Sequence, residues 1–142
     1  MYRRHIARTE LCPHGCTDTE NVYHLFVKCT VARRVWALFV PSVSLHRNIV
    51  LPRLTADDIL FGPPGGCTTP RLQHQWRIVS AVKQVIWETR NIRVYHKQDQ
   101  PFIVQRRRIT LLLRDYAIQD FKNHPDTARD TWGVERWKDV SI

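Results

Sequence analysis

The sequence lacks any apolar run long enough to cross a membrane. A transmembrane helix needs about 20 apolar residues, and no segment of the 142 residues approaches that length. The N-terminal stretch MYRRHIARTEL carries charges and has no apolar region of the kind that signal peptides contain. We therefore expect an intracellular protein, in the nucleus or the cytoplasm.

Patterns typical of enzymes are also missing. The chain has no glycine-rich phosphate loop, no spaced acid–base pair and no nucleophile with an activating base. Internal repeats and low-complexity tracts are absent as well. These absences indicate a binding domain that is not an enzyme.

Acidic residues are scarce relative to basic ones. The chain holds 22 Lys and Arg against 13 Asp and Glu, a net charge of +9, and 17 of the basic residues are arginines. Residues 67–114 alone carry 10 basic and 2 acidic groups. Because guanidinium groups pair with phosphates and stack on bases, this balance points first to nucleic acid as the partner. An anionic membrane surface is the second reading.

Strand patterns are nearly absent, the short IVL segment at 49–51 being the best candidate. A first helix is expected after Thr30, ending before Pro41. A second, short helix is expected after Thr55, which would form a capping box with Asp58. Gly62 would end this helix, and PPGGCTTP (63–70) reads as a loop.

The remainder of the chain, 71–142, reads as a helical subdomain. Apolar residues recur at helical spacing in two long segments, 71–96 and 103–121. A third helix is expected after Pro125, with Trp132 and Trp137 beside it. The sequence thus predicts a mainly α fold with a small CCHC zinc knuckle packed on a helical subdomain. Its parts would be a zinc-knuckle region with the following helix (1–40), a connecting segment (41–70) and the helical subdomain (71–142).

Three of the four cysteines lie in CPHGCTDTENVYHLFVKC, residues 12–29. Zinc in structural sites prefers four thiolate and imidazole ligands in a tetrahedron, which the set Cys12, Cys16, His24 and Cys29 would supply. Four protein ligands close the coordination shell, so we expect a structural zinc ion and no catalytic metal. Free buried thiols are the alternative.

Three other residues bear on this site. His14 could replace one ligand, His5 is a weaker candidate, and Cys67 in the Pro/Gly loop looks uninvolved. Val22, Leu25 and Phe26 are expected to cover the ion with apolar groups. Because so short a segment buries little by itself, we expect residues 10–40 to be disordered without metal.

The spacing Cys-x3-Cys-x7-His-x4-Cys followed by VARRVW resembles the cysteine-rich region near the C-terminus of LINE-type non-LTR retrotransposon reverse transcriptases. DDILFG (57–62) and VKQVIWETRN (82–91) are similar to two further phrases of that family, so the resemblance covers about residues 10–95. Many members write CPxCG where this chain writes CPHGC. The matching residues of the first phrase are Cys12, Pro13, Cys16, Glu20, His24, Phe26, Cys29, Ala32, Val35 and Trp36.

The polymerase motif of that family, Tyr-x-Asp-Asp, has no match in this chain. The resemblance therefore implies a non-catalytic accessory domain that binds RNA. Other parts of a retrotransposon polymerase are further partners that it implies. Two readings stay open beside it: a protein-interaction domain with a purely structural zinc, and a relic fragment without independent function.

Candidate nucleic-acid contacts fall on the two long helices. Lys83, Arg90 and Lys97 recur every seven residues, with Trp76 and Trp87 near them. Positive charge beside aromatic rings suits single-stranded nucleic acid, although tryptophans at helical spacing are more often core. Near the start of the second long helix the helix dipole disfavours cations, and a bound phosphate would relieve that repulsion. The cations there are Arg106, Arg107 and Arg108.

Overall fold

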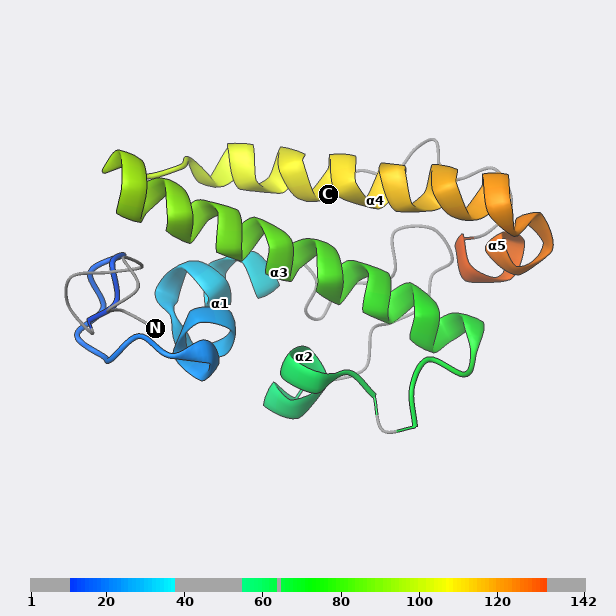
Figure 1. Cartoon of the computed structure of the whole chain (residues 1–142), viewed down its shortest axis with the longest axis horizontal. Coiled ribbons are helices and arrows are strands. Elements are labelled where there is room, and N and C mark those ends of the chain that lie inside the picture. The colour runs from blue at the N-terminus through cyan, green and yellow to red at the C-terminus, as the bar shows by residue number, and fades with distance from the viewer. Residues whose placement is uncertain (1–10, 38–54, 64, 133–142) are drawn as a thin grey trace.

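The computed structural model describes residues 11–37, 55–63 and 65–132, and this part of the chain is helical without strands (Figure 1). The predicted mainly α fold is therefore confirmed. None of the described helices is long and apolar enough to cross a membrane. The elements are the π-helical turn η2 (His24–Lys28) and the helices α1 (Thr30–Trp36), α2 (Ala56–Phe61), α3 (Pro70–His96), α4 (Phe102–Asn123) and α5 (Pro125–Trp132).

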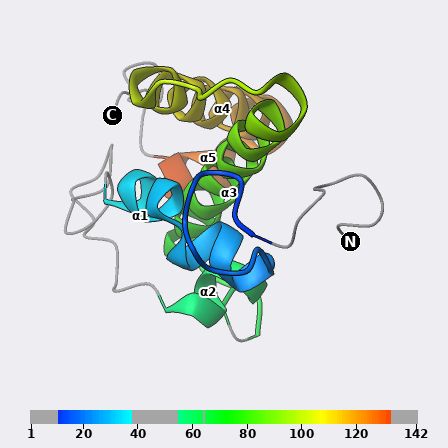
Figure 2. The same cartoon turned by 90° about the vertical axis from the view of Figure 1, so that its left-hand side faces the viewer.

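Helix α3 is the centre of the fold. It forms an antiparallel hairpin with α4, and α5 packs against both at the far end of the hairpin (Figures 1 and 2). On its other side α3 contacts η2 and α1, and α1 also reaches α4. Because α3 has neighbours on both sides, its buried residues spread around the helix: Ile78, Val79, Ala81, Val82, Val85, Ile86, Thr89 and Arg90 are all buried.

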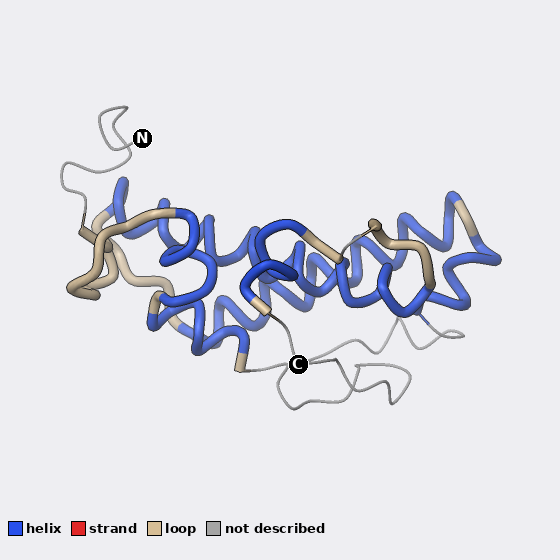
Figure 3. Tube along the Cα trace, turned by 90° about the horizontal axis from the view of Figure 1, so that it is seen from below, coloured by secondary structure: helices blue, strands red, loops and turns tan. Residues whose placement is uncertain are grey.

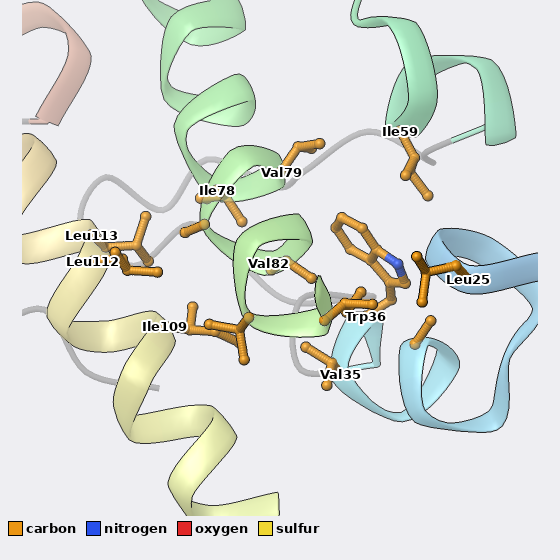
Figure 4. Close-up of a cluster of buried hydrophobic side chains, with 14 of the residues drawn as sticks. Leu25, Val35, Trp36, Ile59, Ile78, Val79, Val82, Ile109, Leu112 and Leu113 are labelled. Atoms are coloured by element: carbon orange, nitrogen blue, oxygen red, sulfur yellow. The ribbon is translucent and has the colours of Figure 1, made fainter. Parts of the chain in front are cut away.

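One hydrophobic core joins the segments that the sequence separates. Trp36 of α1 lies against α3 near Val82, with Leu25 and Ile59 beside it (Figure 4). The Trp36 indole Nε1 donates to the Phe26 carbonyl at 2.8 Å, which fixes α1 to η2. The other side of α3 packs against α4 through Ile109, Leu112 and Leu113 (Figure 4). The α1–η2 unit is therefore held by α3 as part of the same core.

The helix ends follow local chemistry closely. The predicted capping box is present: Thr55 Oγ1 accepts from the Asp58 N–H at 3.1 Å, and Asp58 Oδ2 accepts from the Thr55 N–H at 3.0 Å. Gly62, at φ 82°, ends α2 as predicted. The hydroxyl of Thr69 accepts from the Leu72 N–H at the start of α3.

The start of α1 differs from the prediction. The residue before the helix is Cys29, not Thr30, which is already helical. Cys29 has the extended backbone (φ −56°, ψ 142°) of a residue that precedes a helix, and the Arg33 N–H donates to its carbonyl. Pro41, Trp137 and the IVL segment lie outside the described residues.

Candidate metal centre

Four side chains converge beside the N-terminal end of the fold. One ligand atom from each of Cys12, Cys16, His24 and Cys29 lies within 4.8 Å of the other three. The Sγ atoms of Cys12 and Cys29 are 3.7 Å apart, and those of Cys16 and Cys29 are 3.9 Å apart. In a tetrahedral site with metal–sulfur bonds of about 2.3 Å, two sulfurs are separated by about 3.8 Å. The predicted ligands therefore lie together at a spacing that can hold one metal ion.

The first two ligands come from a tight turn. The Gly15 N–H donates to the Cys12 carbonyl at 3.2 Å, and Gly15 has φ 93°, a conformation that glycine adopts without strain. An antiparallel bridge between Leu11 and Thr19 then closes this loop. We call residues 11–21 the metal loop (tan near one end in Figure 3).

The last two ligands bracket the π-helical turn η2. The Cys29 N–H donates to the His24 carbonyl at 2.7 Å, an i→i+5 bond that brings residues five positions apart together. Asn21 Oδ1 accepts from the His24 N–H at 2.8 Å and fixes the start of the turn. The sequence expectation of a helical turn or compact loop between His24 and Cys29 is thus met by a π turn.

The surroundings of His24 fit a metal ligand. Its side chain is buried, and within the described residues neither ring nitrogen has a hydrogen-bond partner. Leaving a buried polar atom without a partner costs free energy, and a metal ion would satisfy one nitrogen. The carboxylate of Asp18 lies 3.8 Å from Nδ1. Metal-binding histidines commonly have a carboxylate on their other ring nitrogen.

The contact between Cys12 and Cys29 favours the ionised form of Cys29. A hydrogen bond from Cys12 and the N–H groups of Val31 and Ala32 lower the pKa of Cys29 to about 5. The same pairing raises the pKa of Cys12, and burial raises it further. Since metal binding requires deprotonated sulfur, Cys29 is prepared for it at the start of α1.

The residues predicted to cover the metal ion, and the alternative ligands, do not all lie where the sequence predicts. Leu25 is buried and Phe26 is partly buried, but Val22 is 62% exposed, so the prediction that Val22 covers the site is wrong. His14 is not among the four clustered ligands, and burial lowers its pKa. Cys67 also lies outside the cluster, and His5 falls outside the described residues.

The metal loop is attached to α3 by two arginines. Arg90 donates from Nη2 and Nε to the two carboxylate oxygens of Glu20, at 2.8 and 3.2 Å. Arg93 Nε donates to the Pro13 carbonyl at 3.1 Å. Arg90 is fully buried, so the expectation that it contacts nucleic acid is not supported; its charge is used inside the fold.

Lys83 and Lys97, the other two basic residues predicted to contact nucleic acid from this segment, differ in their exposure. Lys83 is half-buried, its Nζ is 5.3 Å from the centre of the Phe26 ring and 5.6 Å from that of Trp76, and it reaches the Leu60 carbonyl at 3.5 Å. Lys97 is exposed at the end of α3. The heptad spacing therefore does not produce one open basic surface.

The arginine triplet spreads around α4. Helix α4 begins at Phe102, so the triplet lies in its second turn. The helix dipole acts mainly within the first turn, so it repels these arginines less than the sequence predicts. Consecutive helical residues point about 100° apart. Arg108 binds Glu88 of α3 through Nε and Nη2 at 3.1 and 3.2 Å, Arg107 is exposed, and Arg106 is half-buried one turn after Phe102.

A contact that the sequence did not suggest joins α1 to α4. The guanidinium carbon of Arg34 lies 4.4 Å from the centre of the Phe102 ring. Arg33 and Arg34 are both exposed on α1, the helix that begins next to Cys29. We call Arg34, Phe102 and Arg106 the α1–α4 basic surface.

Comparison of the chain with protein-family models, with curated proteins and with solved structures finds no match. The resemblance to retrotransposon reverse transcriptases therefore stays a hypothesis, as does the function taken from it.

Proposed function

We propose that the chain is a non-catalytic RNA-binding module built on one structural zinc ion. The donor set of three cysteines and one histidine is the type that zinc prefers, and four protein ligands close the coordination shell. A closed shell leaves no position for water or substrate on the zinc ion, so its contribution would be to the fold. This proposal agrees with the resemblance to the C-terminal region of LINE-type reverse transcriptases, whose RNA-binding role it adopts.

The observation that carries the proposal is the position of Cys29. It is a predicted zinc ligand and also the residue from which α1 begins. Helix α1 presents Arg33 and Arg34, and Arg34 lies over the Phe102 ring of α4. Metal binding at Cys29 would thus fix the helix that carries the arginines.

The chemistry of the α1–α4 basic surface suits single-stranded RNA. Guanidinium groups pair with phosphates, and an aromatic ring beside them offers a face for stacking. Arg106 is one turn from Phe102 on the same side of α4, which extends the surface along that helix. Lys97 is exposed in the connection that precedes α4 and adds a further cation. The intracellular location that we propose would keep the cysteine ligands reduced.

The test is a titration of a labelled single-stranded RNA of about 16 nucleotides against salt. For single strands the log–log slope is about −0.7 per phosphate contact, so Arg34→Gln with Arg106→Gln should reduce its magnitude by about 1.4. Arg129→Gln is the matched control, because Arg129 is an exposed helical arginine on α5 between Asp126 and Asp130. Salt-independent binding, or the same slope in the parent and the double variant, would reject the proposal.

A further inference from the structure

Helix α4 has apolar residues on two opposite faces. Ile109, Leu113 and Ala117 fill the core and are fully buried. On the other face Val104, Leu111 and Ile118 are 37%, 44% and 46% exposed. A surface helix normally has one apolar face, and apolar groups on both sides are typical of a helix that is covered on both.

The spacing of the exposed residues is regular. Val104, Leu111 and Ile118 are seven positions apart, which is close to two helical turns, so they form one line along α4. Single exposed apolar residues are ordinary. Three on one line give a second helix an apolar strip to lie along, narrower than a coiled-coil seam, which has two apolar positions in each heptad.

Four charged residues flank the central leucine on α4: Arg107 and Asp115 lie four positions from it, and Arg108 and Arg114 lie three positions from it. Arg107 lies four positions before Leu111, Asp115 lies four positions after it, and both are exposed. In an interface with two-fold symmetry the same surface is used by both subunits. If two copies of α4 run antiparallel with Leu111 on the axis, Arg107 of each copy faces Asp115 of the other. Val104 then faces Ile118.

A parallel arrangement lacks this complementarity, since it would place Arg107 against Arg107 and Asp115 against Asp115. Arg108 also lies beside this face, but its charge is balanced within the chain, because Glu88 binds it. By the same symmetry Arg114 of one copy faces Arg108 of the other. The antiparallel orientation thus has opposite charges at two of four contacts and the parallel orientation at none, so the antiparallel one is the more complementary.

We propose that the outer face of α4 is a self-association surface and that two copies of the chain pair through it, antiparallel, with Leu111 at the two-fold axis. The contact consists of an apolar line flanked by two equivalent Arg107–Asp115 ion pairs. It does not involve the metal centre or the α1–α4 basic surface, so it is independent of the proposed RNA-binding function.

The first experiment measures the mass of the zinc-loaded, nucleic-acid-free full chain by sedimentation over a range of concentrations. The parent should shift from monomer to dimer as concentration rises, and Leu111→Glu should remain monomeric. Phe61→Glu is the control, because Phe61 is an apolar side chain 79% exposed on α2, away from this face. A parent that stays monomeric throughout, or a Leu111→Glu variant that dimerises like the parent, overturns the proposal.

A charge exchange tests the orientation and does not rely on a disruptive substitution. Arg107→Asp and Asp115→Arg each create two like-charge pairs across the interface and should weaken the dimer about tenfold or more. The double variant restores opposite charges and should recover most of the parent affinity. No recovery rules out the antiparallel pairing. If Leu111→Glu instead lowers the unfolding free energy of a monomeric parent, the face is covered by the same chain and the proposal is wrong.

Discussion

Arg90 of α3 and Glu20 of the metal loop form a buried ion pair between residues 70 positions apart. The Arg90 side chain is 1% exposed and that of Glu20 is 13% exposed. The carboxylate is joined through both of its oxygens, which fixes the loop in orientation as well as position. The metal loop is thus attached to the central helix by a bidentate contact.

Glu20→Gln should destabilise the fold strongly, because it leaves the Arg90 charge buried without its counter-charge. The expected loss is about 3 kcal/mol of unfolding free energy, measured by urea denaturation of the zinc-loaded protein. Glu88→Gln is the matched control. It removes a half-exposed ion pair with Arg108 and should cost less than about 1 kcal/mol. Equal losses in the two variants would contradict the structural role of Arg90.

Protein purified without added metal should contain one zinc ion per chain. Cys16→Ser should remove it, because the site then loses one of its four ligands. Cys67→Ser should leave it unchanged, since Cys67 lies outside the cluster. Elemental analysis of the three samples decides the matter: zinc retained in Cys16→Ser, or absent from the parent, contradicts the predicted site.

Removal of zinc by a chelator should unfold the N-terminal part and spare the helical hairpin. Helix α1 has seven residues, and so short a helix is unstable alone in water. Amide hydrogen exchange should therefore lose protection in η2 and α1 while α4 and α5 remain protected. Continued protection of α1 in a sample shown to be zinc-free would disprove the expectation that residues 10–40 depend on metal.

The Glu88–Arg108 ion pair should weaken in acid. Burial opposes ionisation of Glu88, but hydrogen bonds from Arg108 and Gln84 and the charge of Arg108 outweigh it and lower the pKa of Glu88. A lowered pKa in the folded state stabilises the protein above the usual glutamate pKa, and this contribution is lost as the pH falls through the lowered value. The difference in unfolding free energy between parent and Glu88→Gln should shrink from pH 6 towards pH 3, about one and a half units either side of the usual value. A constant difference would contradict the assignment.

Lys97→Gly should make the protein more stable. Lys97 has φ 56° and ψ 30° at the end of α3, a left-handed conformation that glycine adopts more easily than lysine. The expected gain is up to about 1 kcal/mol, measured by thermal or urea unfolding. Lys97→Gln is the control, because it also removes the charge but retains the Cβ. It should lower RNA affinity as much as Lys97→Gly does, without the gain in unfolding free energy. No gain in Lys97→Gly would show that the backbone strain is relieved elsewhere.

The sequence predicted those features that depend on neighbouring residues. The capping box at Thr55 and Asp58 is decided within four positions, and the four ligands lie within eighteen, so spacing alone indicated both. The long helices were likewise readable from the periodicity of their buried residues. Each of these depends on short separations in the chain, where the geometry of a turn limits the alternatives.

Contacts between distant segments were not predictable in the same way. The heptad spacing of Arg90 with Lys83 and Lys97 predicts a surface cation, whereas its partner Glu20 lies 70 positions away in the sequence. The run of three arginines predicted a phosphate site near the start of the helix, but a helix directs consecutive residues to different sides, and Glu88 binds Arg108. A sequence gives the number and spacing of the charges, but packing decides which of them stay exposed to a partner.

The π turn between His24 and Cys29 affects how this site should be sought in other chains. Its i→i+5 hydrogen bond accommodates one residue more than an α-helical turn. In an α-helix, ligands five positions apart would point about 140° away from each other, whereas ligands four apart share a face. A chain with one residue fewer could therefore present the same pair from an ordinary α turn. A search pattern should accept both spacings, because an inserted residue can be absorbed by the width of the turn.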